Sequence, residues 1–331
     1  MNNTLLAVVI VVGLAFDFTN GFHDTANYVA TWVGTRALSP RMAVGISAAA
    51  NLAGAFVTTA VAKTVAEGII DTNLATQQTV LAALLGAIVW NLLTWWIGLP
   101  SSSTHALIGG LIGAALVQSG AEGVQWHGIV EKVVIPGAVS PVIGFAGAFL
   151  LIIVIYRILF RAAPGMAHRG FRYGQLFTGT WVAFTHGAND AQKTMGVITL
   201  ALIANGNLPS DTFNVPTWVK IAAGLTIAAG TYVGGWRIIR TLGQRIYKMQ
   251  PEHGFAAQLS AGTTLYVGTH FGFPISTTHV VTGSIMGAGA TRGVSAVKWG
   301  IAGNILVAWL LTLPAAGLVS ALLYYPVAWI F

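Results

Sequence analysis

The chain has 331 residues, of which 55% are hydrophobic and 8% are charged. So apolar a composition excludes a soluble globular protein, and apolar runs of about 20 residues, long enough to cross a bilayer, recur along the chain. The net charge of +7 comes from basic residues between those runs, which indicates membrane topology and not nucleic-acid binding. We therefore predict an all-α integral membrane protein, embedded in the lipid bilayer and without cysteine chemistry.

The first half is predicted to hold four apolar elements. The first is longer than one straight span needs and contains Gly21, so we expect a broken helix, retained because its start lacks a signal-peptide pattern. The third has two short arms around Pro100, which predicts a helical hairpin. The four elements are residues 5–33, 42–62, 79–117 and 133–156.

The second half repeats this plan, with a second hairpin around Pro274. Its predicted elements are residues 176–203, 219–236, 255–290 and 299–325. We therefore divide the chain into a first transmembrane repeat, 1–156, a basic cytoplasmic linker, 157–175, and a second repeat, 176–331.

Basic residues predict the orientation of these repeats. Twelve of the sixteen Lys and Arg residues fall in four links, at residues 36–41, 157–172, 237–248 and 292–298. The positive-inside rule places these links in the cytoplasm and both termini outside. The external loops then hold Glu67, Asp71, Glu122, Glu131 and Asp211. The two repeats become inverted, with the hairpins meeting at the membrane midplane, an arrangement typical of secondary transporters.

A ten-residue motif occurs once in each repeat. Phe18-Thr-Asn-Gly-Phe-His-Asp-Thr-Ala-Asn27 aligns with Phe184-Thr-His-Gly-Ala-Asn-Asp-Ala-Gln-Lys193. Asp24 and Asp190 coincide within apolar spans, where a carboxylate is costly unless it meets a cation, a proton or water. We predict that they couple transport to a cation or proton, the alternative being acids that face water at a membrane end. Asp17 lies two helical turns before Asp24, has no acidic counterpart, and its role stays open.

The hairpin tips carry a second repeated motif. Leu99-Pro-Ser-Ser-Ser-Thr-His105 echoes Phe273-Pro-Ile-Ser-Thr-Thr-His279. Hydroxyl groups and unpaired N–H groups at a helix start favour an anion, so we predict that the tips bind a tetrahedral oxyanion. The oxyanion-contacting residues in this prediction are Ser102, Ser103, Thr104, Ser276, Thr277 and Thr278. Ordinary helix capping is the alternative for the hydroxyl groups, and backbone bonding is the alternative for the two histidines.

The aligned residues Asn27 and Lys193 differ in charge. We assign Asn27 to cation coupling, and Lys193, with Asn189, to the oxyanion site. Lys193 also lies three residues after Asp190, close enough for an ion pair within a helix. Its ammonium group removes one potential sodium site.

Together these motifs resemble the inorganic phosphate transporter family. The resemblance rests on Gly21-Phe-His-Asp-Thr-Ala-Asn27, Gly187-Ala-Asn-Asp-Ala-Gln-Lys193 and Pro-x-Ser-x-Thr-His at both tips. It implies cation-coupled import of inorganic phosphate across the plasma membrane. Asn51 and Gln258 stand where sodium-coupled members carry glutamates, so the chain is similar to the bacterial low-affinity, proton-coupled members, which implies a metal–phosphate complex as cargo.

Other readings stay open at this stage. A sodium-coupled symporter would use Asp24, Asn27 and Asp190 as metal ligands, and sulfate could replace phosphate. A passive oxyanion channel is disfavoured by the buried carboxylates. An intramembrane hydrolase is disfavoured because no carboxylate accompanies His105, so we expect no enzyme and no cofactor. The oligomeric state, including a homo-oligomer, is undetermined.

Overall fold

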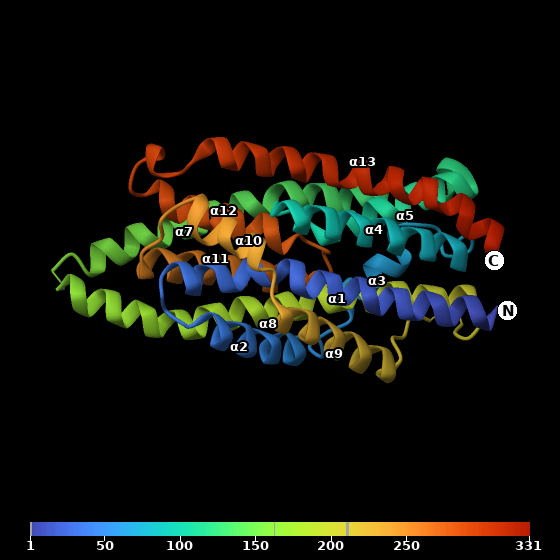
Figure 1. Ribbon diagram of the computed structural model, residues 1–331, viewed down its shortest axis with the longest axis horizontal. Helices are drawn as coiled ribbons and strands as arrows, with labels where there is room; N and C mark the ends of the chain where they lie inside the picture. The colour runs from blue at the N-terminus through green and yellow to red at the C-terminus, as the bar shows by residue number, and fades with distance from the viewer. Residues whose placement is uncertain (1, 162, 210–211) are drawn as a thin grey trace.

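The computed structural model describes residues 2–161, 163–209 and 212–331, and these residues form helices connected by short loops (Figure 1). Asp211, expected in an external loop, lies outside the described residues. The helical elements of the first half are α1 (Asn3–Gly34), α2 (Pro40–Gly54), α3 (Ala60–Glu67), α4 (Gln77–Ile97), α5 (Ser103–Ser119), η1 (Gly120–Gly123), α6 (Trp126–Ile129), η2 (Val130–Val134) and α7 (Ile135–Ile158). Those of the second half are α8 (Pro164–Ala204), α9 (Thr217–Val233), α10 (Trp236–Arg240), η3 (Thr241–Arg245), α11 (Pro251–His270), α12 (Thr277–Ala290), η4 (Val294–Ala296) and α13 (Trp299–Ile330).

Within the described residues, five helical segments are long and apolar enough to cross a membrane. They are Asn3–Gly34, Gln77–Ile97, Ser103–Gly123, Trp126–Ile158 and Trp299–Ile330. Figure 1 shows both termini at one end of the molecule and the connection between α7 and α8 at the other. The α4–α5 hairpin starts from the end that holds the termini, whereas the α11–α12 hairpin starts from the opposite end.

The prediction of a broken first helix is wrong. α1 runs without interruption through Gly21, and α8 runs equally through Gly187. Both glycines serve close helix packing instead. A Cβ atom on Gly21 would lie 2.5 Å from the Ile227 carbonyl oxygen of α9, and one on Gly187 would lie 2.1 Å from the Asn51 carbonyl oxygen of α2.

The interruptions occur one element later than predicted. The span expected over 42–62 ends with α2 at Gly54, and α3 begins only at Ala60. In the second half, α9 ends at Val233 and α10 starts at Trp236 after Gly234, whose φ of +78° suits a residue without a side chain. The stretch expected as a linker, 157–175, is helical from Pro164 onward.

Both hairpins form around the predicted prolines. α4 ends at Gly98 in the left-handed conformation, with φ of +70°. Ser102 then caps α5 by accepting the His105 N–H at 3.1 Å, and Ser276 caps α12 by accepting the His279 N–H at 3.3 Å.

Two apolar cores lie on either side of a polar segment. Along α1, apolar residues from Leu5 to Phe16 belong to the first core and those from Ala26 to Trp32 to the second. α5 packs into the first core and α12 into the second. The polar residues of the two repeated motifs, on α1 and α8, therefore lie where the two cores meet, excluded from solvent.

Candidate functional site

Asp24 and Asp190 come together at the centre of the molecule. Asp24, on α1, is 3% exposed, and Asp190, on α8, is 0% exposed. Each carboxylate has one oxygen held by a neighbour: His23 Nδ1 lies 2.8 Å from Asp24 Oδ1, and Lys193 Nζ lies 2.7 Å from Asp190 Oδ1. The acids therefore lie inside the protein and do not face water at a membrane end.

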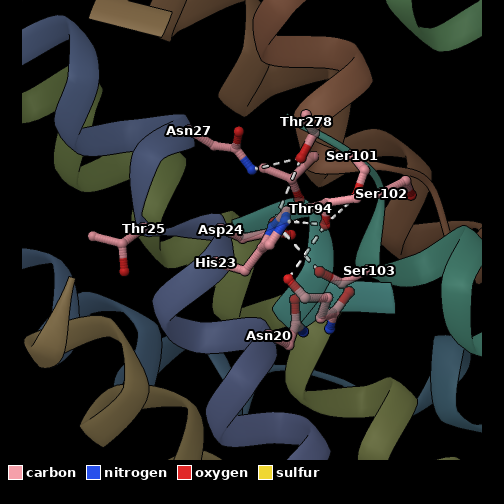
Figure 2. Close-up of polar contacts among 12 residues, drawn as sticks. Asn20, His23, Asp24, Thr25, Asn27, Thr94, Ser101, Ser102, Ser103 and Thr278 are labelled. Atoms are coloured by element: carbon pink, nitrogen blue, oxygen red, sulfur yellow. Dashed lines mark hydrogen bonds and ion pairs between the residues drawn. The ribbon is translucent and has the colours of Figure 1, made fainter. Parts of the chain in front are cut away.

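Hydroxyl groups of both hairpin tips reach these two carboxylates. Ser103 Oγ and Thr278 Oγ1 lie 3.4 and 3.5 Å from Asp24 Oδ1, and Thr277 Oγ1 lies 3.4 Å from Asp190 Oδ1. Figure 2 shows Ser103 and Thr278 approaching Asp24 from different helices, whereas Thr25 points away toward α9. The starts of α5 and α12, two sources of unpaired backbone N–H groups, thus meet at the carboxylate pair.

One side-chain hydrogen bond joins each repeated motif to the hairpin of the other half. Asn27 Nδ2 donates to Thr278 Oγ1 at 3.0 Å, and the aligned Lys193 Nζ donates to Thr104 Oγ1. Lys193 is fully buried, so its ammonium group belongs to the centre of the site and also makes the ion pair with Asp190. The two alternatives for Lys193, an ion pair or a role among the anion contacts, are therefore compatible.

The structure does not bring every predicted residue to the centre. Asn189 Nδ2 donates to Thr269 Oγ1 at 2.8 Å and to the Phe273 carbonyl at 3.1 Å, so this side chain braces the second hairpin. Ser102 and Ser276 are engaged as helix caps. Asp17 is buried, and its Oδ1 accepts from Thr194 of α8 at 2.9 Å, so this hydrogen bond does not go to a hairpin tip.

Three central residues were missed by the sequence reasoning. His186 Nε2 lies 3.8 Å from Asp24 Oδ2 and 3.6 Å from Asp190 Oδ2, and Asn20 donates to Asp190 Oδ2 at 3.2 Å. His23 joins Asp24 to Thr94, whose hydroxyl lies 3.1 Å from His23 Nε2. Asn20 and His186 occupy aligned positions, so a polar residue repeated there inside an apolar helix was the available signal.

The electrostatics of the centre follow from these groups. With neutral histidines, two carboxylates and one ammonium group leave a formal charge of minus one, enclosed between apolar cores. A bound oxyanion adds further negative charge, which is costly at low dielectric unless a cation or proton enters with it. A helical membrane bundle with a buried, charged, hydroxyl-lined centre between two hairpins defines a membrane transport protein.

Comparison with known proteins identifies the family. A model of the phosphate transporter family matches residues 20–320. The chain is 50% identical over 324 residues to a probable low-affinity inorganic phosphate transporter of Mycobacterium bovis, covering 97% of this chain and 77% of that protein. A Bacillus subtilis protein of the same description is 41% identical over 329 residues, covering 99% and 98%. The chain belongs to the phosphate transporter family.

A solved structure supports the fold. The structure described as the sodium-dependent phosphate transporter superposes with a TM-score of 0.91 at 26% identity, covering 99% of this chain and 100% of that one. The protein is therefore a helical membrane transporter of phosphate.

Proposed function

We propose that the protein imports inorganic phosphate across the plasma membrane by symport with protons, with a divalent metal ion travelling on the phosphate. One observation carries the proposal: two buried carboxylates, a buried ammonium group and the starts of α5 and α12 converge on one point. The hydroxyl groups of Ser103, Thr104, Thr277 and Thr278, with the adjacent N–H groups, would bind phosphate oxygens. Asp24 and Asp190 would carry the charge that offsets the anion.

The proton is favoured over sodium by the position of Lys193. Its Nζ lies 2.7 Å from Asp190 Oδ1. The aligned position in the first half is Asn27, which offers a neutral amide instead of an ammonium group. A sodium ion about 4 Å from this ammonium group would be repelled by about 4 kcal/mol at an effective dielectric constant of 20. A proton needs no cage of oxygen ligands and can bind one carboxylate oxygen.

Two buried amides also favour the proton. Asn51 Oδ1 lies 2.6 Å from His186 Nδ1, and its Nδ2 donates to the Ser47 carbonyl at 3.0 Å. Gln258 accepts from Thr178 at 2.9 Å and donates to Thr31. Both side chains are committed to hydrogen bonds with neutral groups and offer no carboxylate to a sodium ion.

In the proposed mechanism, the two halves are inverted repeats, and their movement exposes the central site to one side of the membrane and then to the other. The contacts between the halves are reciprocal: α2 of the first half packs on α8, and α9 of the second half packs on α1. A Cβ atom on Gly54 would meet the Phe184 carbonyl oxygen at 2.0 Å, and one on Gly230 would meet that of the aligned Phe18 at 2.2 Å. With the basic links inside, both termini face the outside and each hairpin forms half of the barrier.

Transport by the purified protein in proteoliposomes tests the coupling ion. Proton and sodium gradients are imposed independently and radiolabelled phosphate uptake is measured, with protein-free liposomes as the control. We expect accumulation in sodium-free buffer that follows the inward proton gradient and is abolished by a protonophore. Strict dependence on sodium at constant pH would show that the protein is instead a sodium-coupled symporter.

A further inference from the structure

Asp17 is a buried carboxyl group that the transport scheme leaves without a role. It lies on α1, seven residues before Asp24, and is 0% exposed. The aligned residue of the second half is Ala183, so this acid occurs in one repeat only. An ionisable side chain inside an apolar helix is costly, and the twofold plan of the protein does not account for it. The neighbours of Asp17, and not the symmetry of the fold, determine its state.

The contacts of Asp17 suit a neutral acid. Its Oδ1 accepts from the Thr194 hydroxyl of α8 at 2.9 Å. Its Oδ2 is buried without a hydrogen-bond partner, and no Lys, Arg or His side chain within the described residues forms an ion pair with it. An ionised carboxylate with one neutral hydroxyl as its sole partner is strongly disfavoured in a buried, apolar setting, because nothing replaces its hydration. A protonated carboxyl group avoids that penalty.

A bare acceptor on the same face of α1 complements this proton. Asn20 lies three residues after Asp17, and this spacing places two side chains on one side of a helix. The Asn20 amide nitrogen donates to Asp190 Oδ2 at 3.2 Å, while its Oδ1 is buried and has no partner among the residues that the structure describes. Asp17 Oδ2, when ionised, and Asn20 Oδ1 are both acceptors, so neither can satisfy the other. A proton on Asp17 Oδ2 supplies the donor that this pair lacks.

The charges around Asp17 also favour the neutral form. α4, α8 and α9 pack against this part of α1. α4 contains no acidic, basic or histidine residue, and the one such residue of α9 is Lys220. On α8, His186 lies 3.6 Å from Asp190 Oδ2, and Lys193 is already paired with Asp190 at 2.7 Å. With neutral histidines, an ionised Asp17 would change the formal charge of the centre from minus one to minus two before any anion binds.

We propose that Asp17 binds a second proton, besides the proton that the symport scheme places on the central carboxylates, and holds it on Oδ2 until the site opens and water accepts it. The position of Asp17 connects this proton to the anion. Its partner Thr194 lies one helical turn from Asp190 on α8, and Asn20 donates to the same Asp190. A negative charge on Asp17 would repel an oxyanion at the centre, so anion binding and protonation of Asp17 favour each other. Transport of this proton rests on the proposed function, whereas its binding does not.

The variant Asp17→Asn tests the proposal, because an amide reproduces the neutral acid in size and hydrogen bonding. Its oxygen can accept from Thr194 and its NH₂ group can donate to Asn20, so the variant should fold, but it cannot release a proton. The matched control is Asp71→Asn, in the loop before α4, where the Asp71 carboxylate accepts the Asn73 N–H in an exposed contact. The control thus removes an aspartate whose carboxylate is hydrated.

Infrared spectroscopy of the purified protein, labelled with carboxyl-¹³C aspartate, measures the protonation state without transport. At neutral pH we expect the wild type to show the carbonyl stretching band of a protonated aspartic acid. Asp17→Asn should lose the intensity of one such acid, and Asp71→Asn should retain the wild-type band. Equal bands in Asp17→Asn and the wild type would overturn the proposal.

Transport in proteoliposomes tests whether this proton travels. Proton entry and radiolabelled phosphate uptake are measured together under an inward proton gradient in sodium-free buffer. We expect Asp17→Asn to carry one proton fewer per phosphate than the wild type, while phosphate exchange at equal pH and concentration on both sides continues. An unchanged proton-to-phosphate ratio would show that the proton stays on Asp17, which contradicts its transport. A wild type that moves no protons with phosphate would contradict the proposed function instead, and the infrared result would still decide whether Asp17 binds a proton.

Discussion

At the scale of single residues, the two halves of the site are alike in position but different in charge. Asn27 and Lys193 are aligned, and each contacts the tip threonine of the opposite hairpin. The first half thus presents a carboxylate beside a histidine, and the second presents a carboxylate already paired with an ammonium group. In the proposed proton symport, Asp24, which has no ammonium partner, is the carboxylate of this pair that we expect to change protonation.

Replacing either carboxylate by an amide should abolish concentrative uptake. Asp24→Asn removes the proposed proton acceptor, whereas Asp190→Asn also leaves the buried Lys193 without its carboxylate partner, which costs about 3–5 kcal/mol in stability. Uptake against a gradient in proteoliposomes and thermal unfolding in detergent check the two effects. Glu122→Gln, at an exposed position, is the control. Accumulation by both aspartate variants would make the carboxylates structural.

At the scale of elements, glycines determine how closely the long helices approach. The Gly187 position on α8 packs against the backbone of α2, whereas Gly45 on α2 has no atom within 4 Å of an added Cβ. Helix backbones in such close contact hold the motif side chains in one register relative to the hairpins.

Gly187→Ala should therefore destabilise the protein and Gly45→Ala should not. The added methyl group would lie 2.1 Å from the Asn51 carbonyl oxygen, so the two helices must separate. We expect a loss of about 1–3 kcal/mol for Gly187→Ala, and a change near zero or a gain of about 0.4–1 kcal/mol for Gly45→Ala. The thermal unfolding midpoints of the two variants, measured in the same detergent, test this expectation. Equal midpoints for the two variants would mean that this crossing does not limit stability.

At the scale of the whole molecule, the two ends of the helical bundle differ in their content of basic residues. The four basic links lie toward the end opposite the termini in Figure 1. The two hairpins start from opposite ends of the molecule. If the end with the basic links is cytoplasmic, α11–α12 enters from the cytoplasm and α4–α5 from outside. Orientation is therefore the property that connects the fold to directional transport.

Single-cysteine labelling tests the orientation, because the natural chain has no cysteine. Ala121→Cys and Ser39→Cys place a thiol at exposed positions. Ala121 belongs to the segment that follows α5 and Ser39 to the connection between α1 and α2, two segments that lie toward opposite ends of the molecule in Figure 1. A membrane-impermeant maleimide should label Ala121→Cys in intact cells and Ser39→Cys only after permeabilisation. The reverse pattern would place the termini inside and contradict the topology drawn from the basic residues.

The sequence alone determined the class of protein, the duplicated motifs and the two hairpins. These follow from local properties: the length of apolar runs, the proline and serine at each helix start, and polar residues that are costly in hydrocarbon. It also indicated the family, through motifs that occur twice in the same order.

Only the tertiary structure decided what the central residues contact. Whether Gly21 breaks a helix or packs it depends on the backbone of α9, which lies more than 200 residues away in the chain. The cross-contacts of Asn27 and Lys193, the bracing role of Asn189 and the position of His186 between two carboxylates depend on how the two halves pack together. Local sequence carries little information on such contacts, because their geometry is set by long-range packing and not by the residues next to them.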